Sequence, residues 1–434
     1  MIKKILFGLL LLFLFLPILQ QAFHLFKTKE LSGEFTKAHS EPFSMKAWMD
    51  GSYQKTNEKY LNENFGFRST CVRINNQLAF NLYQEARAIN VIIGKQNYLY
   101  GDGYVNAYYG NDFIGQEKVA ETVRKLKFVR DTLRKKNIDL MVMIVPGKAL
   151  FFPEFLPDEP HYEKKITNYE SYKQQLEKTN IPFLDMCSYL LKLKKTSPYP
   201  LYPKTGIHWS LYGAEIAVDS LARFVGKLRD TVLPKVTIPR VRLNKNPEGS
   251  DDDVEKGMNL FFQIPKFIMA YPLVDIDFKN TYTPHALIIG DSYVWNIYGS
   301  GRAAQIFNHP HFWYYYKDLY KVGMEGTLRN ENVDLKKEIE EQEVIILLAN
   351  DARLVDFSEG FIDDAYDLYA NGGKGMQEKK EARAKEIAKR MADIKGDKEW
   401  FANLKKEADE KHVPVDSLVK VNAVYTYDMD HQKR

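Results

Sequence analysis

The chain has 434 residues, which at roughly 150 residues per domain allows two or three structural units or one large domain with additions. Apolar residues make up 45% and charged residues 27%, as in ordinary globular proteins, so the composition excludes a wholly disordered or collagen-like chain. The formal net charge of +4 is too small to indicate a nucleic-acid partner. The two cysteines, Cys71 and Cys187, exclude an all-cysteine zinc site and leave a single disulfide possible.

The N-terminus carries an export signature. Lys3 and Lys4 precede an apolar run from Ile5 to Leu19. The run has 15 residues, fewer than the roughly 20 that usually span a bilayer, and this favours a cleaved signal peptide. The absence of a convincing cleavage site near Gln20 favours a retained anchor, and a buried core helix is a less favoured alternative. We therefore expect residues 1–26 to be a signal peptide or membrane anchor, and the remainder to be exported.

The central part alternates between amphipathic helix patterns and short apolar runs. Helices between strands buried on both faces indicate an α/β fold with a mainly parallel sheet, doubly wound and covered by helices on both faces. Such folds bind ligands at the carboxyl ends of the strands. The predicted pairs of helix and strand are 116–136 with 138–145, 169–179 with 181–185, and 334–342 with 344–349.

Two segments flank this domain, for which we expect the bounds 91–365. Residues 27–90 contain little strand pattern and are predicted to be a helical lead-in. Residues 366–434 are rich in Lys and Glu and are predicted to be a charged helical extension, packed on the main domain rather than forming a coiled coil. The acidic triplet Asp251 to Asp253 lacks the ligand spacing of a calcium loop and is predicted to be a solvated connection.

Ser292 is the first candidate catalytic residue. A predicted buried strand ends at Gly290, so Ser292 lies on the turn beyond it, where its hydroxyl faces the ligand crevice. Its own amide would be available to an oxyanion if a helix begins there. The alternative is an ordinary turn in which Asp291 or Ser292 caps a helix.

A serine nucleophile needs a base, and His208 is the best candidate among nine histidines. It lies in the string from Tyr202 to Ser210, ahead of a predicted helix over 212–228. His285, His309 and His311 are the other possible bases, and a purely structural role for His208 is the alternative.

These strings, in this order, resemble the alginate O-acetyltransferase family of AlgJ and AlgX type, whose catalytic domain is SGNH hydrolase-like (flavodoxin-like). The resemblance rests on residues 145–148, 206–209 and 290–292, supported by 62–68 and 94–100. His208 precedes Ser292 by 84 positions, whereas ordinary SGNH hydrolases have the serine first. The motif order is therefore circularly permuted, as it is in that family.

The resemblance implies transfer of an acetyl group, through an acetyl-serine, to hydroxyls of an extracytoplasmic polysaccharide. It implies that Ser292 is the nucleophile and His208 the base, with no metal and no cofactor. It also implies a periplasmic location with anchoring in the inner membrane, and an acetyl donor supplied by a membrane-bound O-acyltransferase. Lys148, Asn350 and Arg353 follow strands and, with Tyr293, are candidates for substrate or oxyanion contacts.

One departure from the family affects the catalytic acid. Gly206 stands where the family has the aspartate that orients the histidine. Asp291 or Asp351 is a possible replacement, as are Asp185 and Asp219; a serine–histidine dyad is a further alternative. An exported esterase or deacetylase, or a catalytically retired polysaccharide-binding protein, therefore stays open as a function. The aromatic run from Phe312 to Tyr316 could bind sugar only through a set of rings that is not buried.

Overall fold

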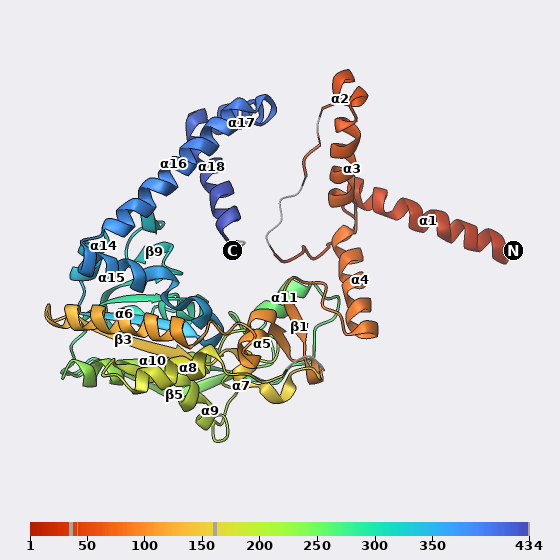
Figure 1. Cartoon of the computed structure of the whole chain (residues 1–434). Helices are drawn as coiled ribbons and strands as arrows, with labels where there is room; N and C mark the ends of the chain where they lie inside the picture. Colours follow the sequence, from red (N-terminus) through yellow and green to blue (C-terminus); the bar gives the residue numbers. More distant parts are fainter. Residues whose placement is uncertain (34–37, 41, 159–162, 433–434) are drawn as a thin grey trace.

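The computed structural model describes residues 1–33, 38–40, 42–158 and 163–432 (Figure 1). Its centre is a seven-stranded mixed sheet in the order β10-β9-β8-β7-β11-β3-β4. The neighbours from β8 to β4 are parallel, whereas β9 and β10 are antiparallel at one edge. The strands of this sheet are β3 (Asp139–Val145), β4 (Phe183–Asp185), β7 (His285–Gly290), β8 (Asn308–Tyr314), β9 (Asp318–Lys321), β10 (Leu328–Arg329) and β11 (Val344–Asn350).

Helices cover both faces of the sheet, as the sequence predicted. Side chains alternate along β3, so that Met141 and Met143 enter the core on one face while Leu140 and Val142 enter the core on the other. The first face is covered by α9 (Met186–Leu193), α10 (Leu211–Leu228), α12 (Trp295–Tyr298) and α13 (Arg302–Ile306). The second is covered by α6 (Gln116–Arg134), α8 (Asn168–Glu177), α14 (Leu335–Glu340) and α15 (Phe361–Asn371).

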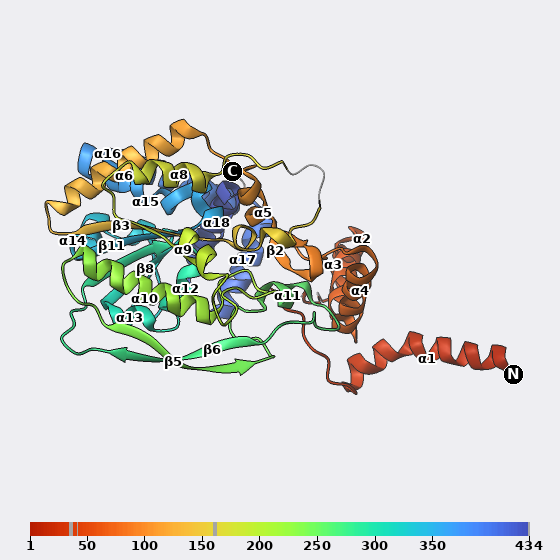
Figure 2. The same ribbon diagram turned by 90° about the horizontal axis from the view of Figure 1, so that it is seen from below.

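A long hairpin outside the central sheet was not predicted. Strands β5 (Lys235–Asn244) and β6 (Met269–Asp277) pair antiparallel and run along one side of the domain (Figure 2). Most of their side chains are exposed or half-buried, so they lack the continuous apolar run that reveals the central strands. The connection between them, residues 245–268, includes α11 (Asp253–Met258).

The N-terminal part is helical. Helix α1 (Ile2–Phe23) is the one described helix that is long and apolar enough to cross a membrane. It is followed by α2 (Met45–Met49), α3 (Ser52–Asn64) and α4 (Arg68–Tyr83), which lie beside the domain (Figure 1). Strands β1 (Val91–Ile93) and β2 (Leu99–Gly101) form a small sheet, and α5 (Asp102–Tyr109) and α7 (Lys148–Phe151) lie between the helical lead-in and the central sheet.

The C-terminal extension contains three helices. Helices α16 (Lys374–Gly396), α17 (Lys398–Lys411) and α18 (Val415–Gln432) enclose a small core of their own. Val419 and Ala423 of α18 complete that core against Ile387 and Ile394 of α16.

Candidate active site

Three neighbouring parallel strands, β7, β11 and β3, end at one edge of the sheet and define the site. Ser292 follows β7 as the first residue of a short 3-10 turn, Ser292–Val294. The first amides of such a turn have no partner within it, so the Ser292 N–H stays available. The amide of Tyr293, by contrast, donates to Asp291 at 2.9 Å.

His208 reaches Ser292 from the loop before α10. Its Nε2 lies 2.8 Å from the Oγ of Ser292. The imidazole packs edge-on against the Tyr293 ring, with ring centres 5.0 Å apart, and the Tyr293 hydroxyl donates to the carbonyl of Ile207 at 3.0 Å. The loop is therefore tied to the residue that follows the serine, which fixes the distance between His208 and Ser292.

Asp253 supplies the carboxylate on the other side of the imidazole. Its Oδ2 lies 2.8 Å from His208 Nδ1. Its Oδ1 accepts from the amides of Ile207 at 2.9 Å and Val254 at 2.7 Å. Because a carboxylate only accepts, the Nδ1 proton points to Asp253 and the Nε2 lone pair points to Ser292. This arrangement is an acid, an imidazole and a serine in series, the geometry used in acyl transfer.

Gly206 explains why the carboxylate comes from a distant segment. A Cβ atom at this position would lie 2.3 Å from the Ser250 carbonyl oxygen and 2.8 Å from that of Asp251. The backbone of residues 250–251 thus occupies the space that a side chain at 206 would need. The close approach that requires glycine also brings Asp253 to the histidine.

The expectation that Asp251 to Asp253 form a solvated connection is wrong. Asp251 is 1% exposed, and its carboxylate accepts from the Tyr271 hydroxyl of β6 at 3.0 Å. Burial raises the pKa of Asp251 to about 7, opposed by that hydrogen bond. Asp252 is also buried and pairs with Lys256 at 2.6 Å. The hairpin packs this segment against the histidine loop, which the local sequence pattern does not show.

Asp291 and Asp351 do not contact the imidazole, so the expectation that one of them orients His208 is corrected. The Oδ2 of Asp291 accepts from both the backbone and side-chain nitrogens of Asn350 at 2.7 Å. Asp351 accepts from the amide of Gly147. Each carboxylate therefore ties the end of one central strand to its neighbour. Burial raises the pKa of both groups, that of Asp351 to about 7.

Lys148 is not exposed to a substrate, contrary to expectation. Its side chain is 0% exposed, and its Nζ donates to the carbonyls of Lys204 and Gly206, both at 2.6 Å. Burial lowers the pKa of this amine, and the Asp253 charge opposes that effect. Lys148 therefore supports the histidine loop from the end of β3.

Two further candidates are buried beside the site rather than open to it. The carboxamide of Asn350 donates to Asp291, and its oxygen accepts from the amide of Ala352 at 2.9 Å. Tyr293 is fully buried, with its hydroxyl on Ile207. Arg353 remains half-buried over the Tyr315 ring at 5.1 Å, and its guanidinium pairs with Glu359.

The remaining acids and histidines named from the sequence are bonded elsewhere. Asp185 caps α9 and pairs with Lys173 at 2.7 Å, and Asp219 pairs with Arg223 at 2.8 Å. The imidazole of His311 pairs with Glu338. His285 bonds the side chain of Asn308, and His309 stacks on His285. Cys71 and Cys187 are both free, the first exposed and the second buried.

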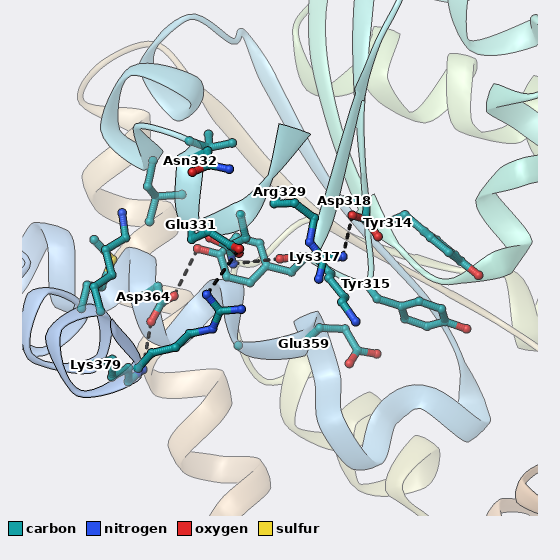
Figure 3. Close-up of a pocket in the computed structure, with 18 of the residues that line it drawn as sticks. Tyr314, Tyr315, Lys317, Asp318, Arg329, Glu331, Asn332, Glu359, Asp364 and Lys379 are labelled. Carbon is teal, nitrogen blue, oxygen red and sulfur yellow. Dashed lines mark hydrogen bonds and ion pairs between the residues drawn. The ribbon is translucent and has the colours of Figure 1, made fainter. Parts of the chain in front are cut away.

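A groove lies at the edge of the sheet, with Tyr315 among the residues that line it (Figure 3). Tyr315 lines the groove and forms a hydrogen bond with Ser292. The pKa of Tyr315 is raised, because burial and the Asp291 charge outweigh the opposing effects of Arg353 and of the hydrogen bond with Ser292. The groove has a volume of about 1210 Å³ and runs between the sheet edge and the C-terminal helices. The aromatic run divides here, since Phe312 and Trp313 are buried on opposite faces of the sheet while Tyr315 faces the groove.

The far wall of the groove is held by ion pairs between the domain and the C-terminal extension. Arg329 bonds Asp428 of α18 at 3.0 Å, and Lys379 of α16 bonds Asp364 of α15 at 2.9 Å. Three other cations that line the groove make no ion pair with any residue within the described ranges: Lys317, Lys336 and Lys380. The groove is lined by seven Lys or Arg and six Asp or Glu side chains, so it carries a small excess of positive charge, with three unpaired lysines, next to an aromatic ring.

Two features of the site escaped sequence reasoning. Asp253 lies 45 positions after His208, on a segment brought in by the hairpin, and no spacing rule connects them. The available signal was Gly206, because a glycine in an otherwise matching motif can mark a close backbone approach. Tyr315 leaves the strand with φ of 48°, so an alternating pattern extended beyond Tyr314 misplaces its ring.

Comparison with known proteins finds a match to one family model. Residues 91–240 match the sequence model of the family described as "SGNH hydrolase-like domain, acetyltransferase AlgX". This range includes His208 but ends before Asp253 and Ser292. The resemblance and the SGNH hydrolase-like fold class that the motifs predicted are thus confirmed.

The chain is also similar to proteins described as "Probable alginate O-acetylase AlgJ". Identity is 26% over 179 residues with the protein from Pseudomonas syringae pv. tomato, covering 41% of this chain and 44% of the relative. It is 25% over 179 residues with that from Pseudomonas putida, covering 41% and 45%. The chain thus matches less than half the length of these curated relatives.

Among solved structures, the O-acetyltransferase domain of Pseudomonas putida AlgJ aligns with 64% of this chain and 99% of its own length, at 18% identity and a TM-score of 0.42. Pseudomonas aeruginosa AlgX aligns with 66% of this chain and 68% of its own length, at 13% identity and a TM-score of 0.42.

Gly206→Ala should weaken both the fold and the site. The new methyl group would force the 250–251 backbone away, and overpacking of this kind costs about 1–3 kcal/mol. Asp253 would move with that backbone, so turnover of a chromogenic acetyl ester should fall. The control is Gly257→Ala, where a Cβ meets nothing within 4 Å. Equal melting temperatures and equal turnover for the two variants would contradict this account.

Asp351→Asn should change how stability depends on pH. A carboxyl whose pKa rises from 3.8 to about 7 on folding binds its proton more tightly in the folded protein, so its contribution to stability declines as pH rises between those values. An asparagine oxygen can still accept from Gly147 but carries no charge. Relative to wild type, the variant should therefore gain stability from pH 5 to pH 8, by about a few kcal/mol. Urea unfolding of the detergent-solubilised chain at both pH values measures this difference; a constant difference would disprove it.

Proposed function

We propose that the protein is an exported O-acetyltransferase that passes an acetyl group through Ser292 to hydroxyls of a polysaccharide. The observation that carries the proposal is the series Asp253, His208 and Ser292, joined by two contacts of 2.8 Å at the carboxyl edge of the sheet. The family match over residues 91–240 supports acetyl transfer as the reaction class.

In the first half of the reaction, Ser292 Oγ attacks the donor carbonyl carbon while His208 Nε2 takes the hydroxyl proton. The carbon–oxygen bond to the leaving group breaks, and that group receives the proton from His208. Asp253 keeps the imidazole in the required tautomer and stabilises its positive charge. In this proposal the free N–H of Ser292 and the Tyr315 hydroxyl donate to the oxyanion.

In the second half, a sugar hydroxyl gives its proton to His208 and its oxygen attacks the acetyl-serine. The ester bond to Ser292 breaks, and the serine recovers its proton from His208. Atoms and charges balance without a cofactor. Water in place of the sugar would make the same residues an esterase, so acceptor binding decides between the two reactions.

The groove beside Tyr315 is the acceptor site in this proposal. Its three unpaired lysines, Lys317, Lys336 and Lys380, favour an anionic chain, and the Tyr315 ring offers a flat surface for a sugar face. The alginate named for the AlgJ relatives is such a chain, since it consists of uronate units. Alginate is therefore the acceptor to test first.

The proposed location is outside the cytoplasm, at the inner membrane. Helix α1 has the length and hydropathy of a membrane span or signal sequence, with Lys3 and Lys4 at its start. A membrane-bound O-acyltransferase would supply the acetyl donor on that side of the membrane.

Asp253→Asn should lower turnover of a chromogenic acetyl ester by about a thousandfold or more, because an amide donates to Nδ1 and selects the wrong tautomer. Ser292→Ala should abolish turnover. Intact-mass spectrometry should detect one acetyl adduct on wild type and none on Ser292→Ala.

The control is Asp219→Asn, whose carboxylate pairs with Arg223 rather than with His208 and should leave turnover unchanged. Wild-type protein without adduct or turnover would overturn the enzymatic proposal in favour of a binding protein. Asp253→Asn with wild-type turnover would remove Asp253 from the mechanism.

Replacing Lys317, Lys336 and Lys380 together by Gln should raise the KM for alginate oligosaccharide by roughly tenfold or more, since each exposed charge contributes up to about 1 kcal/mol. Ester turnover without acceptor should not change. A matched control replaces Lys405 and Lys406, which are exposed on α17 outside the groove. An unchanged KM, or a neutral cello-oligosaccharide acetylated equally well, would place the acceptor elsewhere.

A further inference from the structure

Helix α4 has two faces of different character, and only one of them is used by the domain. Asn76 and Phe80 are buried against the domain, where the Asn76 carboxamide donates to the carbonyl of Met258 at 2.9 Å. Phe80 packs with Leu99 and Leu260 in a small apolar cluster. These contacts fix the rotation of α4 about its own axis.

The opposite face of α4 is open and carries an apolar row, which the exposed Asn75 and Asn81 flank. Ile74, Leu78 and Leu82 are 45%, 52% and 67% exposed. Their spacing of four residues places them in one row, and the exposed Cys71 continues that row by one turn. The helix has only two charged residues: Arg68 at its first position, and Arg73, which is buried and donates to the carbonyl of Leu260. A row of this kind marks an interaction surface.

The position of helix α1 relative to α4 indicates which surface this row faces. Gly66 lies in the turn between α3 and α4, and a Cβ there would be 2.1 Å from the Pro17 carbonyl oxygen and 2.8 Å from the Gln21 amide nitrogen. The two backbones therefore touch, and the turn lies beside the last part of α1. The apolar run of α1 ends at Leu19 and polar Gln20 and Gln21 follow, so the turn is level with the polar end of the run.

Figures 1 and 2 both show α1 running away from the catalytic domain, beyond α3 and α4. The open row on α4 faces away from the domain, because it lies opposite the buried residues Asn76 and Phe80. Both features therefore point to the same side of the molecule. If the run of α1 crosses a bilayer, its polar end lies at the headgroup level, and α4 lies at that level too.

We propose that the row formed by Cys71, Ile74, Leu78 and Leu82 lies on the lipid surface of the membrane that α1 enters. This inference rests on the proposed insertion of α1. The row then enters the boundary between headgroups and acyl chains, as amphipathic helices do over about 5–10 Å. With α1 and α4 both engaged, the lead-in holds the catalytic domain in one orientation on the membrane rather than on a free tether.

A native cysteine in the row provides an attachment site for a fluorescent dye that reports this contact. Cys71 is the exposed thiol within the row, and Cys187 is fully buried, so a thiol-reactive NBD dye on the full-length protein labels Cys71. The labelled protein is reconstituted in vesicles of phosphatidylethanolamine and phosphatidylglycerol, with or without lipids that carry a doxyl quencher high on the acyl chain. We expect a blue-shifted emission and a loss of about half of it with the quencher, as for a dye at shallow depth.

Two variants separate this contact from simple anchoring. Leu78→Glu with Leu82→Glu should abolish the blue shift and the quenching, while ester turnover stays at the wild-type level because both side chains are exposed on the face of α4 opposite the catalytic domain. Cys71→Ser with Lys406→Cys places the dye on α17 and should show neither signal.

Resistance to carbonate extraction reports the insertion of α1 independently. Protein that resists extraction but whose Cys71 dye is not quenched would overturn the surface contact and leave the anchor in place. Protein that is extracted would overturn the anchor and, with it, this inference. Ester turnover in both cases tests the proposed catalytic function separately.

Discussion

The close approach of two backbones at Gly206 is the constraint on which the candidate site depends. The segment 250–251 packs where a side chain at 206 would lie, and this contact brings the Asp253 carboxylate to His208 Nδ1. The carboxylate in turn sets the tautomer that leaves Nε2 facing Ser292. A methyl group added at residue 206 would therefore displace Asp253 and disturb the contact between His208 and Ser292. The displaced segment lies in the connection between β5 and β6, which are outside the central sheet.

Buried polar groups hold the rest of this edge in register. Asp291 and Asp351 connect strand ends through backbone amides, and Lys148 holds the two carbonyls of the histidine loop. Such groups are stable inside a protein only when they are hydrogen-bonded, so each one requires its neighbour to be in place. The positions of the reacting side chains are therefore determined by two factors: the packing of the sheet and the hydrogen bonds between the turns that follow its strands.

Around this framework the chain adds surfaces of different chemistry. The C-terminal helices make one wall of the groove that Tyr315 lines, and the N-terminal helices present an apolar row on the side from which α1 departs. In the proposed function these surfaces would receive the acceptor and the membrane, and the catalytic domain lies between them. The reaction class would follow from the serine and histidine, whereas the choice of acceptor would follow from the groove.

The sequence by itself determined the α/β pattern, the permuted order of motifs and the proximity of Ser292 to a strand end, because apolar periodicity and turn residues are local properties. It also singled out His208 before Ser292, which the structure brings within 2.8 Å. Only the tertiary structure decided that Asp253 faces the histidine, that Lys148 is buried and that Asp291 and Asp351 join strands. These outcomes depend on contacts between segments separated by 45 to 204 positions, made by a hairpin and by strand ends whose neighbours no local pattern specifies.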